Sequence, residues 1–417
     1  MSMQKGKRHP LKNDTSSVRH ACALLIVMLC GVCLIANNAP AQQIELKSEA
    51  VNSAATEIAE PQNAQPKHRW QFGGFVDVGY LLDFNHPANR VFRSRGTAWH
   101  VDRPQINMAA AYLKKKPTED SRWGVELTAH GGKDAELFGF SATASNIRGY
   151  KVLRQFGPTN VSYLAPIGKG LTIQGGIFSS FIGYDSLYSK DNLNYTRPWG
   201  ADFTPYLMMG VNATYPFTKK VTGSFFVVNG YWHLGHANNV PSWGGQGAIT
   251  PTSHVTIKQT VLVGPHQDNT SIRFWRFLSD TIVEHKTEQR TIAFNTNFST
   301  EQVDAPTTPR AWWFAAQMPM RWILNPRWAV AIRPEIAHDN HGRWTLARQT
   351  VTALTSTLEY KLPYKSSNTI FRLEHRFDRS TGPDGGFFRG REVRTGKVGL
   401  TPNQHLMIFA TILTFDR

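Results

Sequence analysis

The residues in this sequence whose types and spacing could support a function are arginines and carboxylates that repeat at every second position. Arg372, Glu374 and Arg376 form one such run, and Arg333 with Glu335 forms another. Because successive side chains of a β-strand point to opposite faces, each run would place its ions on one face. Such a face can attract or repel charged solutes without any covalent step. We therefore expect these ions to act electrostatically.

Motifs that would indicate an enzyme or a metal site are missing. There is no G-x-S-x-G, no H-E-x-x-H, no glycine-rich phosphate loop before a helix and no Cys/His metal set. His338, Asp339 and His341 lie together in HDNH and could bind a metal, although such a group is more typical of a solvated loop. The sequence predicts no catalytic residue, no metal site and no cofactor.

The first 41 residues have the order of a secretory signal peptide. A basic segment, Met1 to Arg19, precedes the apolar run Ala21 to Ala36 and the small-residue site Ala39-Pro40-Ala41, so cleavage is expected after Ala41. An uncleaved transmembrane anchor is the alternative, and the shortness of the apolar run disfavours it. We interpret residues 42–70, which are polar and aperiodic, as a flexible periplasmic segment.

Cysteine content and charge narrow the class of protein further. All three cysteines, Cys22, Cys30 and Cys33, precede Ala41, so the exported chain would have no disulfide, thiol nucleophile or cysteine metal site. Residues 1–41 carry five basic and one acidic residue and so contribute four of the sixteen net positive charges. An exported protein seldom meets nucleic acid, so the remaining excess favours an anion-attracting lumen or contact with anionic lipid.

From residue 71 to the C-terminus the sequence alternates between apolar and polar residues. No stretch of this region approaches eighteen consecutive apolar residues, which excludes helical membrane spans. The alternation predicts sixteen strands, near 72–83, 104–114, 122–131, 154–164, 170–182, 206–216, 220–231, 242–250, 254–263, 274–286, 290–299, 311–323, 328–338, 350–362, 368–378 and 402–415.

The lengths of the connections predict how these strands are arranged. Every second connection is short, as at 324–327, and the alternate ones are mostly long and polar, as at 183–205 and 379–401. Short turns at one end and long loops at the other are typical of an antiparallel transmembrane β-barrel in the outer membrane. We therefore predict that residues 71–417 form an all-β barrel of about sixteen strands.

The charged residues of the predicted strands share one face. A charge turned toward lipid costs about 2 to 4 kcal/mol at the bilayer midplane, so this face would line the lumen. A soluble sandwich with a wet polar face is the alternative interpretation. The pore-lining candidates are Arg321, Arg333, Glu335, Arg372, Glu374, Arg376, Glu126 and Asp77.

A run of arginines follows the first predicted strand. If the connection 84–103 folds inward, Arg90, Arg93, Arg95 and Arg103 would form the basic side of a constriction, where a ring of cations favours anions. Contact with lipid phosphates or plain solvation is an equally strong alternative.

Several segments resemble one family over nearly the whole exported chain. They are GGFVDVGYLLDFNHPANR (73–90), GKGLTIQGGIFSSFIGYDS (168–186), NLNYTRPW (192–199), MMGVNATYPF (208–217) and VVNGYW (227–232). These segments resemble the OmpL-like β-barrel porins of bacterial outer membranes. His266 departs from the family pattern, since an acid is common there. The resemblance implies an outer-membrane channel and carries no catalytic chemistry.

These observations together predict a passive pore for small hydrophilic solutes, with a preference for anions. Its expected partners are outer-membrane lipid and those solutes, with no nucleic acid, and a homotrimer is left open. Two rivals stand beside this interpretation: a closed barrel whose long loops bind a ligand or partner, and an outer-membrane hydrolase.

Overall fold

The computed structural model describes most of the chain from residue 70 onward. The described residues are 70–137, 150–231, 234, 238–267, 270–303, 308–382, 384–393 and 397–417. The predicted signal peptide, its cleavage site after Ala41, and residues 42–69 of the predicted periplasmic segment lie outside them.

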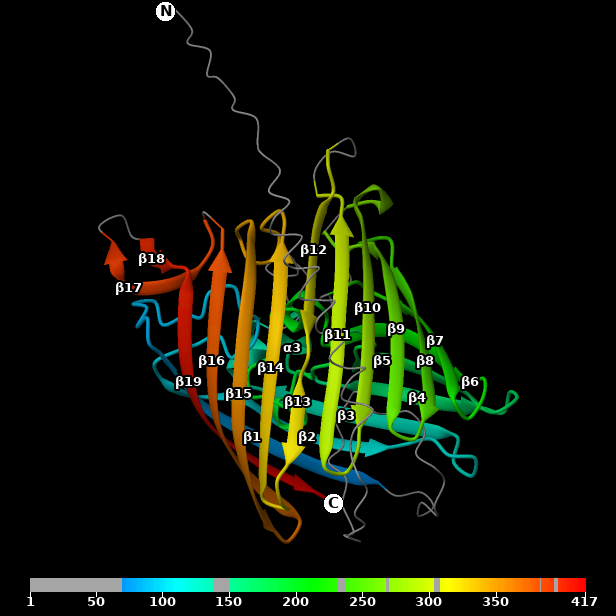
Figure 1. Cartoon of the computed structure of the whole chain (residues 1–417). Helices are drawn as coiled ribbons and strands as arrows, with labels where there is room; N and C mark the ends of the chain where they lie inside the picture. The colour runs from blue at the N-terminus through cyan, green and yellow to red at the C-terminus, as the bar shows by residue number, and fades with distance from the viewer. Residues whose placement is uncertain are drawn as a thin grey trace, which may run out of the picture. The chain divides into compact units, whose positions relative to one another are not determined.

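Antiparallel strands form a closed wall (Figure 1). β1 pairs with β2 on one side and with the last strand, β19, on the other, so the sheet has no free edge. The strands of the wall are β1 (Gln71–Asp83), β2 (Pro104–Lys115), β3 (Trp123–Gly131), β4 (Thr159–Ala165), β5 (Leu171–Ser179), β6 (Leu207–Pro216), β7 (Val221–Val228), β8 (Ser242–Thr252), β9 (Val255–Pro265), β10 (Trp275–Lys286), β11 (Arg290–Glu301), β12 (Ala311–Gln317), β13 (Met320–Ile323), β14 (Trp328–Asp339), β15 (Gln349–Tyr364), β16 (Ser367–Thr381) and β19 (Asn403–Asp416).

The described strands cross the wall sixteen times, as the sequence predicted, because β12 and β13 are two parts of one crossing. Both parts pair with β11 and with β14, and Pro319 separates them. Proline has no N–H to donate to the ladder, so the hydrogen bonding is interrupted there. The predicted antiparallel barrel is confirmed.

The structure differs from the predicted strands mainly at the ends next to the long loops. The strand predicted from residue 154 begins at Thr159, because α3 (Tyr150–Leu153) and a turn come first. The predicted loop 379–401 contains a hairpin, β17 (Phe387–Val393) and β18 (Lys397–Thr401). The other short helices are α2 (Lys133–Leu137), η2 (Ser189–Asp191), η3 (Ala201–Phe203) and η4 (Ile272–Phe274). Within the described ranges, no helix is both long and apolar enough to span a membrane.

The two faces of the wall have opposite character, with the parity that the sequence predicts. On β16, Phe371 and Leu373 are 42% and 43% exposed, whereas Arg372 and Glu374 between them are 3% and 0% exposed. β19 repeats the pattern, with Phe409 half exposed and Ile408 buried. The barrel therefore turns an apolar surface outward and encloses its strand ions.

Candidate functional site

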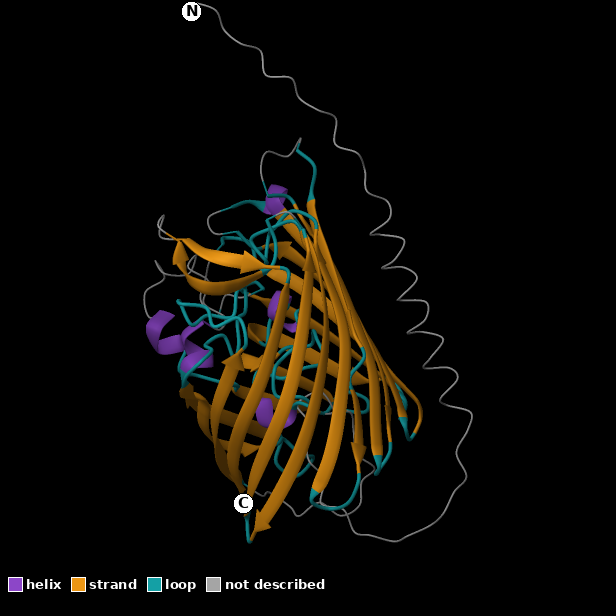
Figure 2. Ribbon diagram, turned by 60° about the vertical axis from the view of Figure 1, so that its left-hand side comes forward, coloured by secondary structure: helices purple, strands orange, loops and turns teal. Residues whose placement is uncertain are grey.

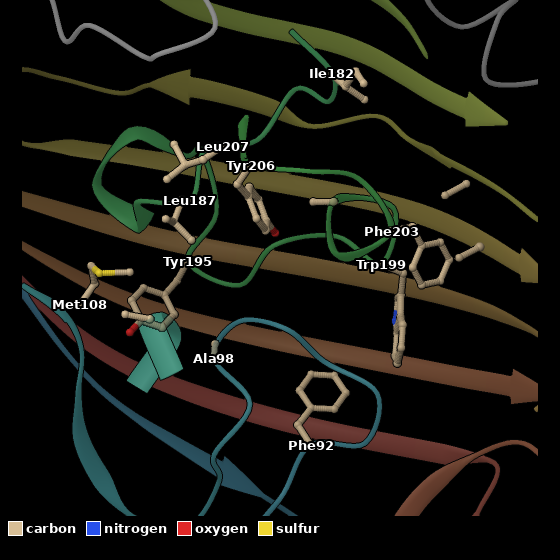
Figure 3. Packing of buried hydrophobic residues seen from close by; sticks show 14 of the residues in the cluster. Phe92, Ala98, Met108, Ile182, Leu187, Tyr195, Trp199, Phe203, Tyr206 and Leu207 are labelled. Atoms are coloured by element: carbon tan, nitrogen blue, oxygen red, sulfur yellow. The ribbon is translucent and has the colours of Figure 1, made fainter. Parts of the chain in front are cut away.

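One long connection runs through the interior of the barrel. Residues 180–206, between β5 and β6, form this crossing loop. Figure 2 shows that the strands enclose loops and short helices, and Figure 3 labels Tyr195 and Trp199 of the crossing loop. At its start, the carbonyl of Phe181 accepts a hydrogen bond from Gln246 Nε2 on β8 (2.8 Å). Further along, Asn192 O accepts from Arg372 Nη2 on β16, at the same distance. The crossing loop therefore contacts widely separated parts of the wall.

Carboxylates of the wall bind backbone N–H groups of the crossing loop. Glu374 accepts from Tyr195 N (2.6 Å) and Thr196 N (2.9 Å). Glu335 accepts from Trp199 N (2.5 Å). A backbone N–H enclosed away from water needs such a partner, and a charged acceptor gives a shorter and stronger bond than a neutral one. The acidic side chains thus fix the middle of the loop.

Arginines of the same strands bind the backbone carbonyls of the crossing loop. Because the ions alternate along β14 and β16, the wall offers a donor beside each acceptor. The bonds are Arg372 Nη1 to Ser189 O (2.7 Å), Arg372 Nη2 to Asn192 O (2.8 Å), Arg333 Nη1 to Thr196 O (2.6 Å) and Arg376 Nη1 to Arg197 O (3.0 Å).

The ions that hold the loop also pair with each other. Arg376 Nη2 lies 2.9 Å from Glu335 and 2.8 Å from Asp378, and Arg372 Nη2 lies 2.8 Å from Glu359. Buried pairs add little net stability, because removing two charges from water offsets their attraction. Their effect here is geometric, since each side chain is fixed in one position from which it reaches the loop.

An irregularity in β2, next to β1, adds a further contact between the wall and the crossing loop. The register of β1 and β2 shifts between Asp77 and Val78, and both Asn107 and Met108 become fully buried. Tyr195 OH donates to Asp77 Oδ1 (2.8 Å) and accepts from Asn107 Nδ2. The bulge therefore places an extra polar group against the loop.

Three loops meet at the buried side chain of Asp134. Asp134, on α2, lies 3.3 Å from Arg197 Nη1 of the crossing loop and accepts from Ala98 N of the connection between β1 and β2 (2.7 Å). Burial raises the pKa of Asp134 to about 7, although the nearby Arg197 opposes that shift. The negative charges of Asp77 and Asp202 also raise the pKa of Asp134, because they disfavour a further negative charge beside them.

Aromatic packing joins the crossing loop to the connection between β1 and β2 and to β17. The rings of Trp199 and Phe92 are 5.8 Å apart, and Phe387 of β17 lies 6.1 Å from Trp199 (Figure 3 shows Phe92 and Trp199). The Arg95 guanidinium lies 4.9 Å from the Trp199 ring and 3.0 Å from Asp202. Apolar contact and charge pairing thus act together to dock the crossing loop.

The structure brings six of the eight pore-lining candidates together beneath the crossing loop. They face inward and are at most 3% exposed: Asp77, Arg333, Glu335, Arg372, Glu374 and Arg376. The other two are partly exposed and bind other wall residues. Arg321 pairs with Glu359 (2.5 Å), and Glu126 accepts from Asn160 (3.2 Å).

The four predicted constriction arginines do not lie together. Only Arg95 among them reaches the crossing loop, where it also donates to Arg197 O (2.6 Å). Arg93 donates to backbone carbonyls of the β16–β17 connection, and Arg103 lies 3.1 Å from His100. Arg90 is exposed.

Sequence reasoning gave no role to Tyr195, Arg197, Trp199, Asp134 or Asp202. It grouped residues 183–205 with the long polar loops and used 192–199 only as a family segment. The composition of the crossing loop held a signal, because Phe, Leu, Tyr and Trp recur in it and such side chains are expected to be buried.

The HDNH segment has a structural role. The Asp339 carboxylate accepts from the backbone N–H groups of His341, Arg343, Trp344 and Thr345 (2.7 to 3.3 Å). It therefore holds a tight loop after β14. Among the described residues, no three His, Cys, Asp or Glu side chains are grouped so that they could hold a metal ion.

One known protein family matches this chain over the whole length of the barrel. The sequence model of the family described as "Putative beta-barrel porin-2, OmpL-like" matches residues 69–415. No curated protein matches the chain.

Solved structures with a similar fold include several outer-membrane proteins. One is the outer membrane channel DcaP of Acinetobacter baumannii, with a TM-score of 0.51, 10% identity, and coverage of 84% of this chain and 97% of that one. Another is the anion-selective porin from Comamonas acidovorans, with a TM-score of 0.52, 8% identity, and coverage of 84% of this chain and 100% of that one. The trimer form of OmpT from Vibrio cholerae has a TM-score of 0.50 and 8% identity, with coverage of 84% of this chain and 99% of that one. At such identities the likeness concerns the fold.

Proposed function

Because the chain belongs to the OmpL-like family of β-barrel porins, whose model covers residues 69–415, we propose that it is a passive channel gated by its own crossing loop. The resemblance seen in the sequence is confirmed, and the protein is an outer-membrane porin. The solutes would be small and hydrophilic, since the wall turns its ions inward and its apolar side chains outward.

One observation carries the gating part of the proposal. The crossing loop is held inside the barrel by inward-facing ions of β14 and β16, and these ions are almost completely buried. A solute that passes this level must go around the loop or displace it. The position of the loop therefore sets what can pass.

Planar-bilayer recording of refolded protein tests this function. We expect stepwise conductance, with a state of low or zero conductance when the crossing loop is held and a state of higher conductance when it is released. Complete absence of conductance from folded, inserted protein would instead favour a closed barrel whose loops bind a ligand. The deep burial of the loop and its ions is the observation that favours this second candidate.

We further propose that the channel prefers anions. The net charge supports this, because removal of residues 1–41 takes away four of the sixteen positive charges and leaves twelve. Arg321, a partly exposed inward-facing cation outside the crossing loop that pairs with Glu359, supports it as well. The porin from Comamonas acidovorans that has a similar fold is anion-selective, which is consistent with this proposal. Reversal potentials in a chloride salt gradient should show anion preference, and Arg321→Gln should reduce it. A cation preference in the parent protein would contradict the proposal.

We also propose that the channel forms homotrimers through the side with the shortest strands. β4 and β7 have seven and eight residues, whereas β15 and β16 have sixteen and fifteen. A strand needs about nine to eleven residues to span a bilayer, so the short side is better covered by protein than by lipid. Light scattering in detergent should give three copies, and a monomeric mass would refute the assembly.

Export with cleavage after Ala41 belongs to the same proposal. The observation that supports it is the small-residue site Ala39-Pro40-Ala41 after the apolar run. N-terminal sequencing of protein from the outer membrane should begin at Gln42. Retention of Met1 would refute it.

A further inference from the structure

Two strands carry basic side chains on the outer, lipid-facing side of the barrel. Arg379 and His375 on β16 have the opposite parity to the buried Arg376 and Asp378, so they point outward, and both are exposed. His405 on β19 is also exposed and faces the same way. We call Arg379, His375 and His405 the outer basic patch.

The register of β16 and β19 brings the three side chains of the patch close together. Phe377 pairs with His405, and the next outward pair is Arg379 with Asn403. His405 Nδ1 lies 3.3 Å from His375 Nε2. His375 and His405 are therefore in contact across the two strands, and Arg379 lies on the same face of β16, separated from His375 by Phe377.

The patch lies at the end of the wall that carries the long loops. Arg379 is two residues from the end of β16 at Thr381, and Asn403 is the first residue of β19. Toward the opposite end of the same strands, the outward residues are Leu373, Phe409 and Leu413, which are 43% to 51% exposed. Apolar side chains of this kind match hydrocarbon, so the patch marks the level where headgroups begin.

The chemistry around the patch suits an anion. The outward-facing residues of β16 and β19 include no Asp or Glu, so these two strands place no carboxylate beside the arginine. Arginine binds phosphate through two parallel hydrogen bonds, and imidazole nitrogens add further donors. Placing a cation at the bilayer surface costs little free energy, and placing it beside a lipid phosphate is favourable.

We propose that the outer basic patch binds the phosphate of an anionic lipid headgroup in the leaflet nearest the long loops. The bound phosphate accepts hydrogen bonds from Arg379 and from the imidazole of His405 or His375. The acyl chains of that lipid then lie along Leu373 and Phe409. This site is independent of solute passage, because its residues face away from the crossing loop.

Native mass spectrometry of the full exported chain in detergent tests the site. The probe is diphosphorylated lipid A, and the comparison lipid is the same molecule after removal of its phosphates. The double variant Arg379→Gln, His405→Gln removes the principal donors. The matched control is Arg290→Gln, because Arg290 begins β11 at the short-turn end. A heat-dependent shift in gel mobility confirms that each variant is a folded barrel.

We expect the parent protein and the control to retain phosphorylated lipid A at least tenfold better than the dephosphorylated lipid. The double variant should lose that preference. Equal retention of both lipids by the parent protein would overturn the proposal, and so would an unchanged preference in the double variant. If the double variant instead lost a self-association that the parent protein shows, with no change in lipid binding, the patch would be a contact between copies and the proposal would also fail.

Discussion

Glu374 is the position where the gating hypothesis can be tested most directly. Its carboxylate accepts two backbone hydrogen bonds from the crossing loop, from Tyr195 N and Thr196 N, at 2.6 and 2.9 Å. In Glu374→Gln, the amide keeps one carbonyl oxygen and replaces the other acceptor with an NH₂ group. One loop N–H would then face a donor, in a position that water does not reach.

The magnitude follows from the bond that is lost. A hydrogen bond to a charged group contributes about 1.5 to 3 kcal/mol, and each 1.4 kcal/mol changes an equilibrium about tenfold. We therefore expect the ratio of released to held crossing loop to rise about tenfold to hundredfold. The wall should be unaffected, because its strand ladders do not involve this side chain.

Single-channel recording in planar bilayers measures this ratio as the frequency and duration of the larger open state. Glu288→Gln, in the exposed turn between β10 and β11, is the matched control and should behave like the parent protein. If Glu374→Gln folds and inserts but shows the same open-state occupancy as the parent, the contact with the loop does not gate the channel.

Two further perturbations address the loops around the same site. Because burial raises the pKa of Asp134 from 3.8 to about 7, its neutral form favours the docked loops, and this contribution is complete below pH 3.8 and is lost as pH rises through about 7. Open-state occupancy should therefore be higher at pH 8 than at pH 5. Asp134→Asn, which cannot ionise, should flatten this pH dependence. If the variant keeps the same pH dependence as the parent protein, another group is responsible for it. Trp199→Ala removes a buried indole, a change that typically costs about 3 to 5 kcal/mol, so the crossing loop should become more sensitive to limited proteolysis. Trp123→Ala, on the exposed outer face, is its control, and equal sensitivity in the two variants would count against docking through Trp199.

Much of the fold could be predicted from sequence because it depends on local geometry. The period of two in a strand is set by covalent structure, so Arg372 and Glu374 share a face whatever surrounds them. The apolar face and the segregation of short turns from long loops then favour a closed barrel. Pro319 shows the limit of this reasoning, because its effect on the ladder depends on β11 and β14 lying on either side.

The candidate site could be predicted only in part. Parity places Arg333 and Glu374 on the inner face, but it does not say whether water or protein covers them. Their partners are far away in the chain, as with Tyr195 and Glu374, which are separated by 179 positions. No periodicity relates two such residues.

The sequence by itself determined where the strands run and which side chains each strand turns inward, because both follow from backbone geometry and from the free energy of placing ions in hydrocarbon. Only the tertiary structure decided that the inward ions bind the crossing loop. That contact exists because barrel closure brings β1, β14 and β16 around residues 180–206, whose backbone donors and acceptors must be satisfied inside the wall.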